Sequence, residues 1–205
     1  MSSWLDPANW PIWFICVAMV LAAVIDGWKL KVPNWLTFPL ILSGWGLGLV
    51  HTLGYHLGEN GSGGLLDSFL ASIVGLLLLL PLYAIGGMGA GDVKMQAGFG
   101  AWIGAFFRGG EGLWIVVWAF FLGAIIGGVI GLGMMLARGR LRHNLQNMRT
   151  ILASLVSTGS LEQIGNQGDE LRAKEPKLPY GIPLCIGFLC YLVFFVSLPG
   201  GRVGS

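Results

Sequence analysis

The feature that most constrains this chain is the recurrence of long apolar runs separated by more polar connections. The runs cover residues 10–25, 36–53, 65–85, 96–107, 113–137 and 178–198. A transmembrane helix needs about 20 predominantly apolar residues, and only the run at 96–107 is clearly shorter. Its helix gains a turn if it begins at Asp92. The pattern predicts an all-α membrane protein with about six transmembrane helices in a single domain, 1–205.

Composition supports a membrane protein and gives no indication of a cofactor. The chain is 55% hydrophobic and 11% charged, whereas an ordinary soluble domain is about 25% charged. Its net charge of +2 gives no reason to expect a nucleic-acid partner. Cys16, Cys185 and Cys190 lie inside apolar runs without a C-x-x-C pair. They are therefore predicted to be small buried hydrophobes, and no metal site is expected.

The positions of the basic residues predict an orientation in the membrane. If the runs cross the membrane alternately, only Arg108 and Arg202 lie on one side. The other side carries Lys29, Lys31, Lys94, Arg138, Arg140, Arg142, Arg149, Arg172, Lys174 and Lys177. Loops rich in Lys and Arg stay in the cytoplasm. We therefore expect a cytoplasmic loop at 138–177, between the fifth and sixth spans, and both termini outside.

The loop at 138–177 contains a pattern of its own. In "RLRHNLQNMRTILASLVS", apolar side chains recur at steps of four and three, at Leu141, Leu145, Met148, Leu152 and Leu155. This spacing predicts a cytoplasmic amphipathic helix with arginines beside its apolar stripe. The helix would either lie on the inner membrane surface, where anionic lipids attract arginine, or dock on the cytoplasmic ends of the spans.

Two aspartates stand out because a membrane-embedded chain usually avoids charge. Asp26 ends the first run and Asp92 begins the fourth, so the predicted topology brings both to one side at one depth. Such carboxylates are costly unless they are solvated, paired or functional. Each also has a structural interpretation, since Asp26 could pair with Lys29 one turn later and Asp92 could cap its helix.

As a pair, the two carboxyl groups would suit peptide hydrolysis. Two carboxyl groups within hydrogen-bonding reach tend to share one proton. The ionised member can take a proton from water while the neutral member donates a hydrogen bond to a peptide carbonyl. We therefore interpret Asp26 and Asp92 as a candidate aspartic-protease pair that needs no metal and no covalent intermediate.

The glycines before Asp92 would serve this site by their small size. Gly87, Gly89 and Gly91 precede the acid in "GMGAGD". Glycine permits unusual backbone angles and close approach of other atoms. We expect these residues to bring the backbone close to a substrate strand and to let a helix start abruptly at Asp92.

Residues around the first aspartate complete the candidate site. Pro33 and Asn34 in "VPNWLT" indicate a helix start, with Asn34 as its N-cap. Lys29 and Lys94 would either tune the two acids or anchor the chain at the membrane edge, and we favour anchoring. His51, His56 and His143 form no metal-ligand pattern and are expected to be solvated.

The segments "DGWKLKVPNWLT" and "GGMGAGDVKMQAGFGAWIG" together resemble the type IV prepilin peptidases, membrane aspartic proteases with a Gly-x-Gly-Asp motif. The resemblance implies that Asp26 and Asp92 are catalytic. It implies removal of the basic leader of prepilins at the cytoplasmic face of the bacterial inner membrane. "LPYGIPLCIGFL" resembles the last-span entry of small Flp-type members. The zinc-binding cysteines of larger members are absent, so a peptidase-only form is implied and N-methylation is not expected.

Other functions remain open at this stage. A proton-coupled transporter would place acids near the middle of the membrane, whereas here they lie at the span ends. A non-catalytic assembly subunit would use both aspartates structurally. A presenilin-type protease would carry a Tyr before the first aspartate, where this chain has Ile25. The sequence does not indicate an oligomeric state.

Overall fold

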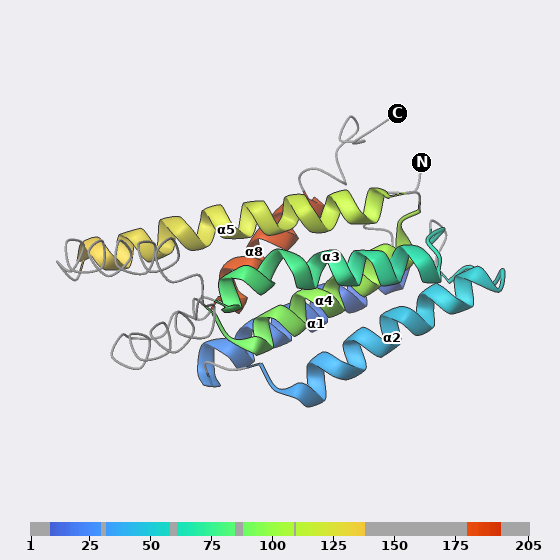
Figure 1. Ribbon diagram of the computed structural model, residues 1–205, viewed down its shortest axis with the longest axis horizontal. Coiled ribbons are helices and arrows are strands. Elements are labelled where there is room, and N and C mark those ends of the chain that lie inside the picture. Colours follow the sequence, from blue (N-terminus) through green and yellow to red (C-terminus); the bar gives the residue numbers. More distant parts are fainter. Residues whose placement is uncertain are drawn as a thin grey trace.

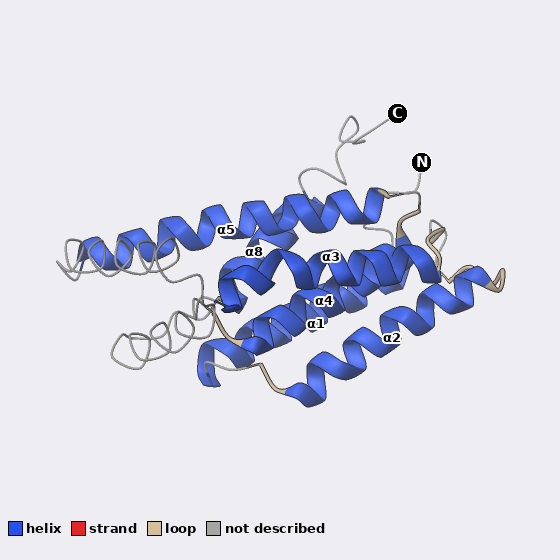
Figure 2. Cartoon of the chain, in the orientation of Figure 1, coloured by secondary structure: helices blue, strands red, loops and turns tan. Residues whose placement is uncertain are grey.

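The computed structural model describes residues 9–29, 32–57, 61–84, 88–108, 110–137 and 180–193. In these ranges all regular secondary structure is helical (Figure 2). The helices are α1 (Trp10–Lys29), α2 (Asn34–Thr52), α3 (Leu65–Ala84), α4 (Ala90–Phe106), α5 (Glu111–Ala137) and α8 (Gly181–Tyr191). Each overlaps one predicted apolar run, so the all-α class is confirmed. The predicted amphipathic helix in 138–177 lies outside the described residues, and a single domain over 1–205 stays a prediction.

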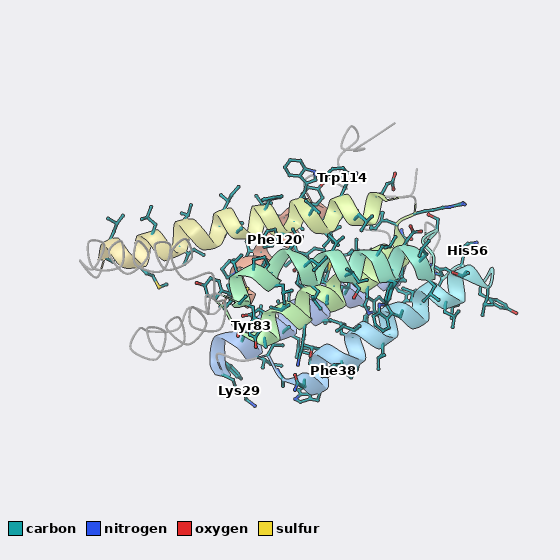
Figure 3. The ribbon with its side chains drawn as sticks, in the orientation of Figure 1. Lys29, Phe38, His56, Tyr83, Trp114 and Phe120 are labelled. Atoms are coloured by element: carbon teal, nitrogen blue, oxygen red, sulfur yellow. The ribbon has the colours of Figure 1, made fainter. Side chains whose placement is uncertain are left out.

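The helices alternate in direction along the bundle (Figure 1). The chain enters α2, α4 and α8 at the same end at which it leaves α1, α3 and α5. We call this the acid end, because α1 ends there with Asp26 in its final turns and α4 begins there with Asp92. Figure 3 shows Lys29 and Tyr83 at the acid end and His56 at the opposite end.

Length and composition identify α1, α3 and most of α5 as candidate membrane spans. The qualifying segments are Trp10–Lys29, Leu65–Ala84 and Glu111–Met134. α4 is shorter, with 17 residues, and carries Asp92 and Lys94 in its first turns. The described part of α8 has 11 residues. The structure thus agrees with a membrane protein, while the predicted number of about six spans stays a prediction.

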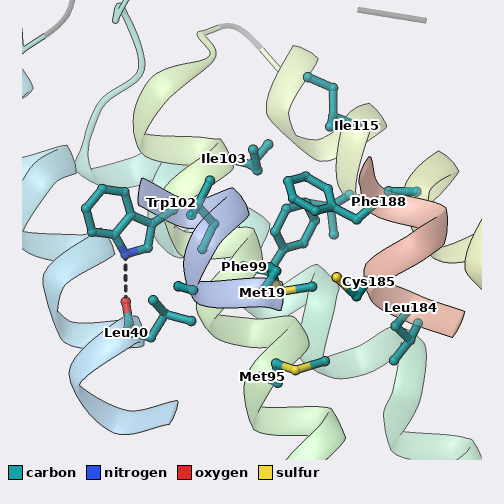
Figure 4. Close-up of a cluster of buried hydrophobic side chains, with 14 of the residues drawn as sticks. Met19, Leu40, Met95, Phe99, Trp102, Ile103, Ile115, Leu184, Cys185 and Phe188 are labelled. Atoms are coloured by element: carbon teal, nitrogen blue, oxygen red, sulfur yellow. Dashed lines mark hydrogen bonds between the residues drawn. The ribbon is translucent and has the colours of Figure 1, made fainter. Parts of the chain in front are cut away.

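α4 is enclosed by the other helices. Every residue from Met95 to Phe106 is buried, and α4 contacts α1, α2, α3 and α5. The rings of Phe99 and Phe188 meet edge to face with centroids 4.0 Å apart, which joins α4 to α8. The indole Nε1 of Trp102 donates to the backbone oxygen of Leu40 in α2 at 3.0 Å (Figure 4). α4 is therefore the central helix of the bundle.

Small residues make this enclosure possible. A Cβ added at Gly100 or Gly104 of α4 would overlap a backbone oxygen of α3, that of Ala71 or Asp67. A Cβ at Gly75 of α3 would lie 2.6 Å from the backbone oxygen of Gln96. Small residues at four-residue spacing let membrane helices meet backbone to backbone, and here they hold α3 against α4.

His51 corrects one expectation from the sequence. It is only 4% exposed, although we expected it to be solvated. Its Nδ1 lies 2.8 Å from the backbone oxygen of Ala105, and the Leu57 N–H donates to its Nε2 at 3.1 Å. The ring therefore satisfies backbone groups where α2 and α4 end. His56 is exposed as expected, and His143 lies outside the described residues.

Gly100→Ala tests the backbone contact between α3 and α4. The added methyl group has no room beside Ala71, so we expect about 1–3 kcal/mol of lost stability from overpacking. Gly128→Ala in α5 is the matched control, since a Cβ there meets nothing within 4 Å. Unfolding in detergent, followed by circular dichroism, gives the comparison. Equal stability of the two variants would contradict the proposed contact.

Candidate functional site

Asp26 is buried near the end of α1 and bonded to a distant helix. The residue is 3% exposed. Its Oδ2 accepts a hydrogen bond of 2.9 Å from the backbone N–H of Gly181, which is 155 positions away and begins α8. The first N–H groups of a helix have no partner within that helix. The Asp26 carboxylate therefore supplies a partner to the start of α8.

Asp92 is held by the helix to which it belongs. It is the third residue of α4 and is 5% exposed. Its Oδ2 accepts from the N–H of Gly89 at 3.3 Å, and its own N–H donates to the oxygen of Gly89 at 3.2 Å. Asp92 therefore does cap its helix, as the structural interpretation required. The hydrogen bond also orients the carboxylate, so capping is compatible with a chemical role.

Gly91 brings the start of α4 against the connection that follows Asp26. A Cβ on Gly91 would lie 2.8 Å from the backbone oxygen of Val32 and 3.0 Å from its nitrogen. Val32 is buried and lies between α1 and α2. The structure therefore gathers the end of α1, the start of α4 and the start of α8 at the acid end (Figure 1). Proton sharing between the two acids stays a prediction.

The three motif glycines do not behave alike. Gly87 lies outside the described residues. Gly89 has φ −81° and ψ 148°, an extended conformation open to any residue, so the conformational freedom that glycine permits is not used there. The helix begins at Ala90 rather than at Asp92. Among the described residues the glycines with positive φ are Gly54 and Gly110, neither of them in the motif.

The residues after Asp26 have roles that differ from the expected ones. Pro33, not Asn34, occupies the N-cap of α2, because the Pro33 carbonyl already accepts the first helical hydrogen bonds, from Leu36 and Thr37. The Asn34 side chain instead accepts from Lys94 Nζ at 3.1 Å. This exposed contact joins α2 to α4.

The two lysines of the predicted site lie at the surface of the acid end. Lys94 Nζ also lies 4.9 Å from the ring centroid of Phe38, so its described contacts are with α2. Lys29 is exposed at the end of α1. Exposure of Lys29 is compatible with the favoured anchoring role, which stays a prediction for both lysines.

Metal-binding residues do not converge in the described part of the chain. No group of three or more His, Cys, Asp or Glu side chains there could hold a metal ion. Cys16, Cys185 and Cys190 are free thiols, and Cys185 is buried while the other two are half-buried. What the described site offers chemically is a set of carboxylates and backbone N–H donors.

The sequence does not predict the contact between Gly181 and Asp26. Its only signal is a glycine near the start of the last apolar run, in "LPYGIPLCIGFL". A glycine at that position does not reveal which distant side chain it contacts, so the pairing follows only from the tertiary structure.

Comparison with known proteins gives one matching family. The profile of the type IV leader peptidase family matches residues 13–132, a range that includes both aspartates. Two proteins named prepilin leader peptidase/N-methyltransferase, from Aeromonas salmonicida (strain A449) and Aeromonas hydrophila, are each 33% identical over 141 residues. The alignments cover 62% of this chain but 43% of each relative, so the match extends over less than half of their length. No solved structure matches the chain.

Substitution by alanine should have different effects on stability at Gly91 and at Gly89. At Gly91 a methyl group would collide with the Val32 backbone, so Gly91→Ala should lose about 1–3 kcal/mol of stability. At Gly89 the nearest atom to an added Cβ, Asp92 Oδ2, is at an ordinary 3.5 Å, so Gly89→Ala should remain within about 0.5 kcal/mol of wild type. Denaturant unfolding in detergent measures both, and the reverse order would show that the packing of α4 is misassigned.

Proposed function

The chain belongs to the type IV leader peptidase family, and from this premise we propose that it is a membrane-embedded aspartic endopeptidase. Its proposed substrates are type IV or Flp-type prepilins, from which it removes the basic leader. The observation that carries the proposal is the pair of buried carboxylates, Asp26 and Asp92, at one end of the bundle. Each accepts a hydrogen bond from a backbone N–H at a helix start.

In the proposed reaction the two acids hold one proton between them. The ionised carboxylate removes a proton from a water molecule, whose oxygen attacks the carbonyl carbon of the scissile peptide. The protonated carboxyl group donates its proton to the carbonyl oxygen, which gives a neutral tetrahedral intermediate. The intermediate collapses as the carboxyl group that took the water proton gives it to the leaving nitrogen, while the other carboxylate takes a proton from a hydroxyl group of the intermediate, and the carbon–nitrogen bond breaks. One proton again remains on the pair.

Exposed tryptophans support a position of the acid end at the membrane surface. Trp28 is 85% exposed and Trp35 is 68% exposed, and they flank the connection from α1 to α2. Tryptophan is enriched at membrane–water interfaces. Such a position suits a substrate whose basic leader lies outside the lipid and is followed by an apolar helix. The carboxylates could then reach the junction without extracting that helix.

The proposed orientation places the acid end in the bacterial cytoplasm and both termini outside. Its support is the set of basic residues that the topology predicted from the sequence puts on this side, which includes Lys29, Lys94 and the seven Lys and Arg residues of 138–177. Basic connections are retained on the cytoplasmic side of the inner membrane.

A non-catalytic assembly subunit is the second candidate, because both aspartates also have structural hydrogen bonds. Asn variants separate the two functions. Asn keeps a side-chain oxygen that can accept from the Gly181 or Gly89 N–H, but it cannot exchange the proton that hydrolysis requires. A structural role therefore tolerates the substitution better than a catalytic role does.

We expect Asp26→Asn and Asp92→Asn each to reduce leader removal by about 10²–10⁴-fold, the usual contribution of acid–base groups. The assay is co-expression with a Flp-type prepilin, with the leader followed by gel mobility and mass spectrometry. Glu111→Gln, an exposed acid in the first turn of α5, is the matched control and should cleave like wild type. Undiminished cleavage by either Asn variant, at equal expression, would contradict the catalytic pair, whereas absence of cleavage by wild type would favour the assembly subunit.

Chelation gives a further test of the aspartic mechanism. Because the proposed steps need only carboxylates and water, an excess of EDTA or o-phenanthroline, which removes metals from protein sites, should leave the cleavage rate of purified enzyme unchanged. A loss of activity that added zinc restores would show that a metal takes part in the reaction.

A further inference from the structure

The two acids differ in the origin of the N–H group that holds them. Asp92 receives its hydrogen bond from Gly89, three residues earlier on the same chain segment. Asp26 receives its hydrogen bond from Gly181, which belongs to another helix. The contact of Asp92 with Gly89 is therefore made when α4 forms. The contact of Asp26 with Gly181 is made only when α8 docks against α1.

The start of α8 is shaped to receive a carboxylate. The N-terminus of a helix carries unpaired N–H donors and a partial positive charge. Gly181 also leaves space for the acid, since a Cβ there would lie 2.9 Å from Oδ2, 3.1 Å from Cβ and 3.2 Å from Cγ of Asp26. On the α1 side, a Cβ on Gly27 would meet Ile182 Cδ1 at 3.3 Å. Glycines on both helices thus bring the donor to within 2.9 Å of Oδ2.

We propose that Gly181 is a positioning residue for the reaction, an inference that rests on the proposed peptidase function. Its N–H fixes the orientation of the Asp26 carboxylate, and its missing side chain makes the contact possible. The active site then consists of three helix ends, those of α1, α4 and α8, and not of the two aspartate-bearing helices alone. Gly181 does not exchange protons or contact the scissile bond; it acts through Asp26.

Gly181→Ala tests the inference through the separate kinetic constants. The added methyl group displaces the carboxylate, and a displacement of about 1 Å can cost on the order of 10²-fold in rate. We expect kcat for leader cleavage by purified enzyme to fall about 10–100-fold. KM should stay within about twofold, because the substitution changes an acid and not the surface that holds the peptide.

Two glycine variants separate positioning from packing. Gly128→Ala, in open space on α5, should match wild type in kcat and melting temperature. Gly187 lies in the same helix as Gly181, and a Cβ at Gly187 would overlap the backbone of Gly123. The Gly187→Ala variant should therefore have a lower melting temperature. A Gly181→Ala protein that loses stability like Gly187→Ala and keeps its kcat per folded molecule would overturn the inference.

Hydrogen exchange tests the contact without any assay of cleavage. In wild type the Gly181 amide should be protected, and Asp26→Asn should retain most of this protection because its side-chain oxygen still accepts. Asp26→Ala should raise the exchange rate of this amide by tenfold or more, while the amides of α5 stay unchanged. Equal exchange in wild type and Asp26→Ala would overturn the inference, whatever the activity.

Failure of the inference and failure of the proposed function give different results. If both Asn variants lose cleavage and Gly181→Ala retains wild-type kcat, the peptidase proposal stands and the positioning role is wrong. If wild type leaves every tested prepilin intact, the proposed function fails and the positioning role fails with it. The exchange experiment still reports whether Gly181 contacts Asp26.

Discussion

The close backbone contact between α4 and its neighbours is the constraint on which the rest of the structure depends. A 17-residue helix that carries Asp92 in its first turn is poorly suited to face lipid by itself, since a charged side chain in hydrocarbon is costly. The structure encloses this helix in protein. Enclosure brings α3 and the α1–α2 connection into backbone contact with α4, and a Cβ at Gly91, Gly100 or Gly104 would overlap or crowd the facing backbone. The small residues of α4 therefore decide where Asp92 lies.

The same end of the bundle uses helix starts to hold both acids. Asp92 lies in the first turn of α4, and Asp26 accepts from the first residue of α8. The partial positive charge of a helix N-terminus stabilises a nearby carboxylate, so burial of the two side chains is offset by backbone donors that the helices supply in any case. The same contacts can serve both structural capping and a chemical role, so the presence of a cap does not argue against a chemical role.

The sequence predicted the helices and the two aspartates but not the contacts between them. Apolar runs are continuous and bounded by polar, Gly or Pro residues, so the helix positions follow from local pattern alone. Asp26 and Asp92 could be found because a carboxylate is unusual in such a chain. The roles of His51 and Gly181 could not be predicted, because each depends on a partner from a distant helix, Ala105 and Asp26. Capping and solvation rules use only neighbouring residues, so they do not predict a side chain's role where a contact with a distant helix determines it.

The distribution of charge along the bundle bears on whether the acids serve hydrolysis or proton transport. In the described helices, Asp, Glu, Lys, Arg and His occur only within five residues of a helix end, and Asp26 and Asp92 share one end of the bundle. Asp67 and Glu111 begin α3 and α5 at the other end. Between these ends the central helix contributes buried apolar groups such as Phe99 and Ile103. A relay of acidic or histidine side chains across the membrane needs such residues through its middle, and the Asp, Glu and His residues of the described helices do not lie there. The proposed hydrolysis needs acid–base groups at one end only, and Asp26 and Asp92 share one end.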